Sequence, residues 1–145
     1  MVVIKASKAE GSFLGRGTHV WLVIESEGKK TSFSGARAGK ILRVYKDYKR
    51  DHDRDCERGE IVIPAPAKSG LSEEEWAEAV IAAGDVIMQR YDNHYAFSGI
   101  WPHGKAKSGK QRANCANIIN LIIAQAGGII PKTKLKGFVP GLEME

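Results

Sequence analysis

The clearest alternation of apolar and polar positions lies at Thr18 to Glu25, THVWLVIE. This stretch is rich in β-branched and aromatic residues, which is typical of a strand. The alternation of side chains places His19 and Trp21 on one face and Val20 and Leu22 on the other. Because both faces are largely apolar, the pattern predicts a strand in the centre of a sheet.

A second pattern, at residues 112–128, predicts the helix around which the rest is organised. Isoleucines recur there at helical spacing and, with Leu121, cover most sides, which is typical of a central helix. Asn114 is a suitable N-cap, so Cys115 falls at the first helical position. Gly127 provides a C-cap and Pro131 prevents continuation.

The remaining patterns predict shorter elements and loops. We expect strands at Val2–Ala6, Lys30–Ser34, Ile41–Tyr45 and Ile61–Ile63, a helix capped by Ser72 and Glu75 that runs to about Tyr91, and a further strand near Phe138. We expect loops around Phe13 and Leu14, at 34–40, and in the charged segment 47–60, whose side chains we expect to be solvated. The sequence thus predicts one α+β domain over residues 1–145, with an antiparallel sheet packed against the helix that carries Cys115.

Composition narrows the classes of protein that need consideration. The 145 residues are 43% hydrophobic and 27% charged, as in soluble globular proteins. The longest apolar run is too short to span a bilayer, and no basic start with a long apolar region marks a signal peptide. We therefore expect a cytoplasmic chain with reduced cysteines, unless a specialised machine exports it. The net charge of +5 favours an anionic partner, but the basic residues are scattered and no nucleic-acid motif is present, so no nucleic acid is expected.

Cys115 is the candidate nucleophile. A thiol at a helix N-terminus lies beside unpaired backbone N–H groups and the positive end of the helix dipole, and both favour the thiolate. The Cys115 N–H can also stabilise an oxyanion. Taken alone, a cysteine on an apolar helix is more often a buried core residue, so the rest of the site has to support the assignment.

Cysteine chemistry also requires a base and a group that orients the base. His19 is the preferred base because it lies near the start of a central strand, from which it can reach a helix terminus. His103, twelve positions before Cys115, is the reserve. Counting across the hairpin puts Ser32 and Ser34 on the His19 face if the turn has two or four residues, and Ser32 is the candidate orienting group.

The residues expected to contact substrate are Trp21, Tyr95, Lys110 and Asn114. Lys110 belongs to a basic loop, residues 105–112, that precedes the nucleophile and can attract an anionic substrate. Partial matches to a phosphate-binding loop at 104–111 and a calcium loop at 51–62 each lack required residues. We therefore expect no cofactor and no metal.

The order of these motifs resembles that of the circularly permuted papain-like hydrolases. In that superfamily, which includes NlpC-type cell-wall peptidases and lecithin:retinol acyltransferase-like proteins, the histidine strand precedes the cysteine helix. The matching pieces are THVWLVIE with His19, the strand around Ser32, and Asn114-Cys115 followed by IINLIIAQAG. The resemblance implies Cys115 as nucleophile, His19 as base and a polar residue near Ser32 as third member.

The same resemblance implies a substrate class. It suggests an amidase or endopeptidase that acts on peptidoglycan peptides. Some members of the superfamily are bacterial effectors that are exported without a signal peptide, and such an effector would have an inhibitor or immunity protein as partner. A lipid acyl hydrolase or acyltransferase on the same fold is the alternative. A non-catalytic basic binding domain is the rival from another class. The sequence leaves the oligomeric state open.

Overall fold

A computed structural model describes all residues of the chain except 10–16, 53, 100, 101 and 138. Within that part, seven strands form a single sheet in the order β5-β1-β2-β3-β4-β6-β7. The pairs are antiparallel apart from β6 and β7, which run parallel. The α+β class is confirmed, and the sheet is mixed rather than purely antiparallel.

The strands and helices follow one another along the chain with few long connections. The strands are β1 (Val2–Lys8), β2 (Thr18–Ser26), β3 (Lys29–Ala38), β4 (Ile41–Lys46), β5 (Gly59–Val62), β6 (Tyr95–Phe97) and β7 (Arg112–Ala113). The helices are α1 (Lys49–His52), α2 (Glu73–Tyr91) and α3 (Cys115–Gln125).

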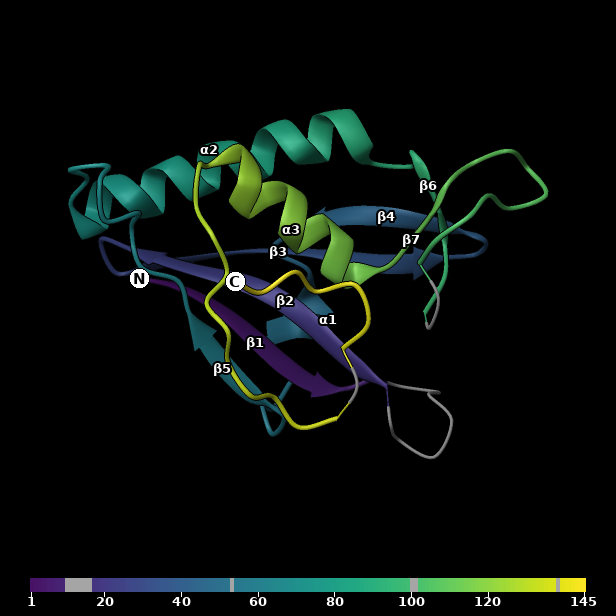
Figure 1. Cartoon of the computed structure of the whole chain (residues 1–145), viewed down its shortest axis with the longest axis horizontal. Coiled ribbons are helices and arrows are strands. Elements are labelled where there is room, and N and C mark those ends of the chain that lie inside the picture. The colour runs from purple at the N-terminus through teal and green to yellow at the C-terminus, as the bar shows by residue number, and fades with distance from the viewer. Residues whose placement is uncertain (10–16, 53, 100–101, 138) are drawn as a thin grey trace.

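Helices α2 and α3 lie together on one face of the sheet, where the core forms (Figure 1). Val20, Leu22 and Ile24 of β2 point into this core and are completely buried. Their neighbours His19 and Trp21 therefore point to the other face, against which the short helix α1 lies. Strand β2 thus contributes apolar side chains to the core on one face and the His19 imidazole to the other.

Several local predictions are confirmed. Strand β2 is third of the seven described strands, and α3 begins at Cys115 behind the predicted N-cap Asn114. The predicted capping box of Ser72 and Glu75 opens α2, which ends at Tyr91.

Two predicted loops are wrong. Segment 34–40 does not leave the sheet: β3 continues to Ala38, and the chain turns only at Gly39, whose φ is +64°. The charged segment is not uniformly solvated, because α1 buries Asp51 to 4% exposure. The strand predicted near Phe138 and the loop around Phe13 and Leu14 fall on residues outside the described part.

The pairing of β2 with β3 covers only one end of these strands. Their ladder runs from Ser26↔Lys29 to Leu22↔Phe33. Beyond it, β2 stays paired with β1 as far as Thr18, and β3 stays paired with β4 as far as Ala38. The described sheet therefore separates between β2 and β3, and we call this region the split end.

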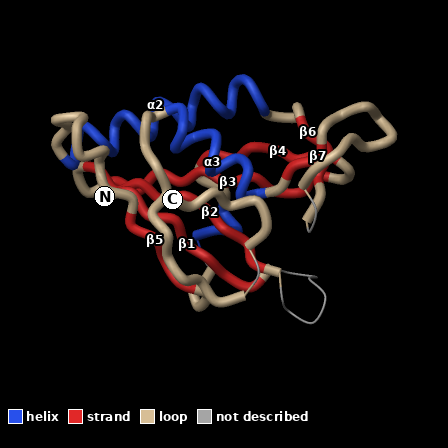
Figure 2. The backbone as a smooth tube through the Cα atoms, in the orientation of Figure 1, coloured by secondary structure: helices blue, strands red, loops and turns tan. Residues whose placement is uncertain are grey.

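The chain after α3 runs down past the sheet to Arg58 and then returns, so that residues 139–145 lie along α3 as an extended strap, drawn as a loop in Figure 2. Asn114 Nδ2 donates to the Pro140 carbonyl at 2.8 Å, and Asn120 Oδ1 accepts from the Glu143 N–H at 3.0 Å. These polar positions of α3 hold the strap in place. In the described part of the chain, no helix has the length and apolarity needed to cross a membrane.

Candidate active site

The start of α3 holds Cys115 at a fixed point beside the split end. Asn114 and Asn117 form a reciprocal capping box: Asn114 Oδ1 accepts from the Asn117 N–H, and Asn117 Oδ1 accepts from the Asn114 N–H. Because the first backbone N–H groups of a helix have no intrahelical acceptor, the Cys115 N–H is available at this position. The residue as a whole is partly exposed.

Gly35 of β3 lets the start of α3 approach the separated strands. An added Cβ at Gly35 would lie 2.8 Å from Ile118 Cγ1 and 3.3 Å from the Cys115 Cα. Only glycine leaves room for this contact. The helix N-terminus consequently reaches the level of the sheet at the point where β2 and β3 part.

At this point the Cys115 thiol meets the His19 imidazole. Burial opposes ionisation of the thiol, but the hydrogen bond from His19, its positive charge, and the N–H groups of Val20 and Ala116 together lower the pKa of Cys115. Burial likewise opposes protonation of His19, yet its hydrogen bonds to Asp51 and Cys115 raise the pKa of the imidazole to about 9. Both shifts favour the thiolate and imidazolium forms of the pair.

Asp51 is the group that orients His19. Its Oδ1 lies 3.0 Å from His19 Nε2, and the two side chains are 1% and 13% exposed. Since Nε2 is used for Asp51, Nδ1 is the nitrogen left for the sulfur. Arg54 Nε lies 3.4 Å from the same carboxylate oxygen, which adds a second positive charge beside Asp51.

Ser32 does not occupy the position expected for the orienting group. It does lie on the His19 face, but it pairs with Val23, four residues along β2 from His19. Its N–H donates to Asp47 Oδ1 at 2.9 Å. Within the described residues its hydroxyl has no hydrogen-bond partner. The error arises because a strand register was extended into a region where the two strands separate.

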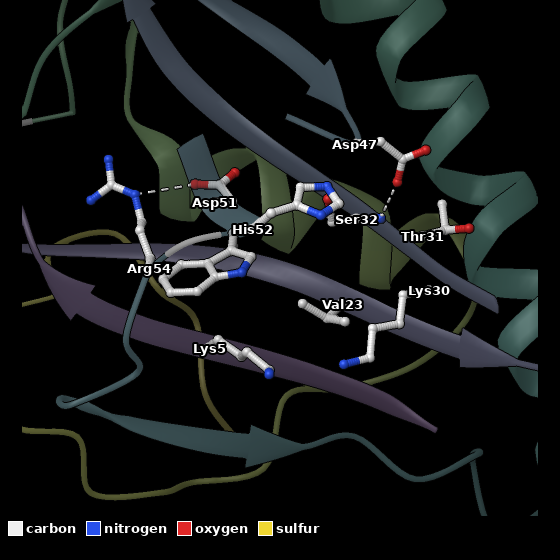
Figure 3. A pocket seen from close by; sticks show the side chains of 10 residues that line it. Lys5, Val23, Lys30, Thr31, Ser32, Asp47, Asp51, His52 and Arg54 are labelled. Atoms are coloured by element: carbon white, nitrogen blue, oxygen red, sulfur yellow. Dashed lines mark hydrogen bonds and ion pairs between the residues drawn. The ribbon is translucent and has the colours of Figure 1, made fainter. Parts of the chain in front are cut away.

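Figure 3 shows the pocket on this face that contains both Ser32 and Asp51. Asp51 and Arg54 lie together on one side, and Ser32 and Asp47 lie on another. Its volume is about 160 Å³. Trp21 lines this pocket and also stacks on the His19 ring, with 5.6 Å between centroids and 16° between planes. Trp21 is 2% exposed, so it supports the imidazole rather than offering a surface to substrate.

Cys115 and His19 line a separate cleft of about 240 Å³ at the split end. Asn114 lines it as well, although its side chain is also committed to the helix cap and the strap. Tyr95 and Lys110 do not line the cleft. Tyr95 stacks on Tyr91, and Lys110 Nζ donates to the Asn93 carbonyl at 2.7 Å.

The other three histidines are not among the described residues that line this cleft. His52, His94 and His103 are exposed, and His94 packs edge-on against two tyrosines. In the part of the chain that the structure describes, no three His, Cys, Asp or Glu side chains gather as a metal site would require.

A thiolate, an imidazolium and a carboxylate in this order can perform acyl transfer. The thiolate is a nucleophile, the imidazolium can protonate a leaving group, and Asp51 keeps the ring in one orientation. Sequence reasoning missed Asp51 because it lies in a strongly charged segment. No local signal in the sequence separates Asp51 from the charged residues around it. Searches of family models, curated proteins and solved structures found no match to this chain.

Proposed function

We propose that this chain is a cysteine peptidase of the permuted papain-like type that hydrolyses an amide bond in peptidoglycan peptides. The observation that carries the proposal is the linked arrangement of Cys115, His19 and Asp51. Structural residues have no need of a polarised thiol beside a raised imidazole pKa, since burying such charges costs stability. Perturbed groups of this kind are typical of functional sites.

In the proposed reaction Cys115 Sγ attacks the carbonyl carbon of the scissile amide. The Cys115 N–H stabilises the oxyanion of the tetrahedral intermediate. The His19 imidazolium donates its proton to the leaving amine, and the C–N bond breaks to leave a thioester. His19, now neutral, takes a proton from water as that water attacks the thioester. The C–S bond then breaks, releasing the carboxylic acid and restoring the thiolate–imidazolium pair.

The lining of the cleft favours a peptide over a lipid. Arg37, Arg50 and Arg54 are among the residues that line it, and cationic side chains suit a peptide that carries carboxylates better than an acyl chain. Among the described residues, the exposed large hydrophobic side chains, Met1, Val62, Leu71 and Ile129, all lie outside the cleft. A lipid hydrolase remains the second candidate on the same catalytic groups.

The test is digestion of purified peptidoglycan, with the products separated and weighed by mass spectrometry. We expect the wild-type chain to release fragments with one new amine and one new carboxylate per cleavage. Cys115→Ser and His19→Ala should release none, and phosphatidylcholine vesicles should remain intact. Fragments that appear equally with Cys115→Ser, or lipid hydrolysis without peptide cleavage, would contradict the proposal.

A further inference from the structure

We propose that Arg37 binds a carboxylate of the substrate, so that the peptide cleaved at Cys115 carries a negative charge close to the scissile amide. This inference rests on the proposed function and names the specificity of the same cleft. It depends on three features of the described residues: the sign of the charges around the thiol, the position of Arg37 on β3, and the way its guanidinium is held.

Apart from the Cys115 thiolate, the charged side chains that line the cleft among the described residues are all positive. Arg37, Arg50 and Arg54 line it together with His19, and none of its described lining residues is an aspartate or glutamate. Arg54 lies beside Asp51, so its charge is partly balanced. Arg37 and Arg50 make no ion pair with any described residue. A small cleft with cationic walls raises the local concentration of anions.

The backbone of β3 places Arg37 on the same side of the strand as the nucleophile. Gly35 is the β3 residue that contacts the start of α3. Side chains two positions apart on a strand point the same way and stand roughly 7 Å apart. Arg37 therefore projects on the α3 side, about one substrate residue away from Cys115.

The guanidinium of Arg37 is fixed at one edge and open at the other. Arg37 Nε donates to the Gly39 carbonyl at 2.9 Å, and its guanidinium carbon lies 5.9 Å from the centre of the Phe97 ring. Phe97 lines the same cleft. The two terminal amino groups make no other hydrogen bond within the described residues. A guanidinium held in this way loses little rotamer freedom on binding, and its fork suits a carboxylate in bidentate geometry.

The test compares alkylation of Cys115 by iodoacetate, which carries a carboxylate, and by iodoacetamide, its neutral counterpart. The intact chain is used with Cys56→Ser, so that Cys115 is the thiol observed. The ratio of the two rates, divided by the same ratio for free cysteine, measures attraction of a carboxylate to the site. Iodoacetamide alone measures the reactivity of the thiol.

We expect the ratio in the wild-type chain to exceed that of free cysteine and to fall about threefold to tenfold in Arg37→Gln. Any fall in the iodoacetamide rate should be smaller, because the neutral reagent senses Arg37 only through the thiolate. The ratio for Arg37→Lys should lie between those of the wild-type chain and Arg37→Gln, because lysine keeps the positive charge but lacks the two-pronged guanidinium. Arg90→Gln, on the last turn of α2, removes the same charge away from the cleft and should leave the ratio unchanged.

An Arg37→Gln ratio equal to the wild-type ratio would overturn the proposal, as would an equal loss in Arg90→Gln. If Arg37→Gln fails to fold, the comparison of Arg37→Lys with wild type decides in the same way. A slow iodoacetamide reaction in the wild-type chain contradicts the proposed enzyme instead. The proposal on Arg37 is tested separately, because the ratio of the two rates reports the charge near the thiol whatever its reactivity.

Discussion

The two ends of the β2–β3 pair differ in what fills the space between the strands. At the end from Leu22↔Phe33 to Ser26↔Lys29, backbone hydrogen bonds join the strands and a two-residue turn closes them. Phe33 is completely buried there beneath α2. At the split end, the start of α3 and a cleft lie where the ladder would continue. The paired end provides stability and the split end exposes a helix terminus and a thiol.

The two ends also differ in how they use acidic residues of the connection after β4. Asp47 accepts from the Ser32 N–H at the paired end, whereas Asp51 contacts His19 at the split end. The first carboxylate replaces a missing backbone partner, and the second controls the protonation of an imidazole. This contrast predicts that equivalent substitutions at the two ends have different consequences, and it gives matched controls.

The largest effect is expected from Asp51→Asn. The amide keeps the shape but removes the negative charge, so the pKa of His19 should fall from about 9 and the pKa of Cys115 should rise. Alkylation of Cys115 by iodoacetamide at pH 7 should slow about 10-fold to 100-fold. Asp47→Asn makes the same charge change and keeps an acceptor for Ser32, so its rate should stay at the wild-type value. Equal rates in the two variants would contradict the assignment of Asp51.

Gly35→Ala should produce the next largest effect. The new methyl group would lie 2.8 Å from Ile118 Cγ1, so the start of α3 has to move away from His19. We expect a roughly tenfold slower alkylation of Cys115 and a loss of about 1–3 kcal/mol in the free energy of unfolding.

The control for that substitution is Gly28→Ala in the turn of the paired end. Gly28 has a φ of +74° and nothing within 4 Å of an added Cβ, so the variant carries backbone strain without a clash. It should lose about 1–2 kcal/mol of stability and none of the thiol reactivity. Urea unfolding and the alkylation rate, measured on the same samples, distinguish the two glycines.

The smallest effect is expected from Asn114→Ala. This change removes the cap of α3 and one hydrogen bond to the strap, and should cost about 1 kcal/mol of stability. Because the cap positions Cys115 but takes no part in the reaction of its sulfur, the alkylation rate should fall by about threefold or less. A rate loss as large as that of Asp51→Asn would indicate that Asn114 acts in the chemistry itself.

The sequence was sufficient where the determinants are local. The alternation in THVWLVIE predicts β2, and the Asn114 cap before an apolar periodic run predicts α3 with Cys115 at its first position. These two elements carry Cys115 and His19, the proposed nucleophile and base. The capping box of Ser72 likewise predicts α2, because its signal lies within four residues.

The role of Asp51 could not be predicted from the sequence, for a physical reason. Asp51 becomes buried only because α1 folds back against the His19 face, a contact between residues 32 positions apart. Its sequence surroundings, with charged residues on both sides, are those of a solvated loop. The choice of Ser32 assumed that the β2–β3 ladder is continuous, and no local pattern marks the point at which those strands separate.

The central claim is that His19 holds Cys115 as a thiolate at the split end. The most direct measurement is the pH dependence of iodoacetamide alkylation in the Cys56→Ser chain, with and without His19→Ala. We predict that the wild-type rate reaches half its maximum below the ordinary pKa of a thiol, because the pKa of Cys115 is lowered, and that His19→Ala moves this midpoint up into the ordinary range. A midpoint at the ordinary thiol value that does not change in His19→Ala would contradict the account.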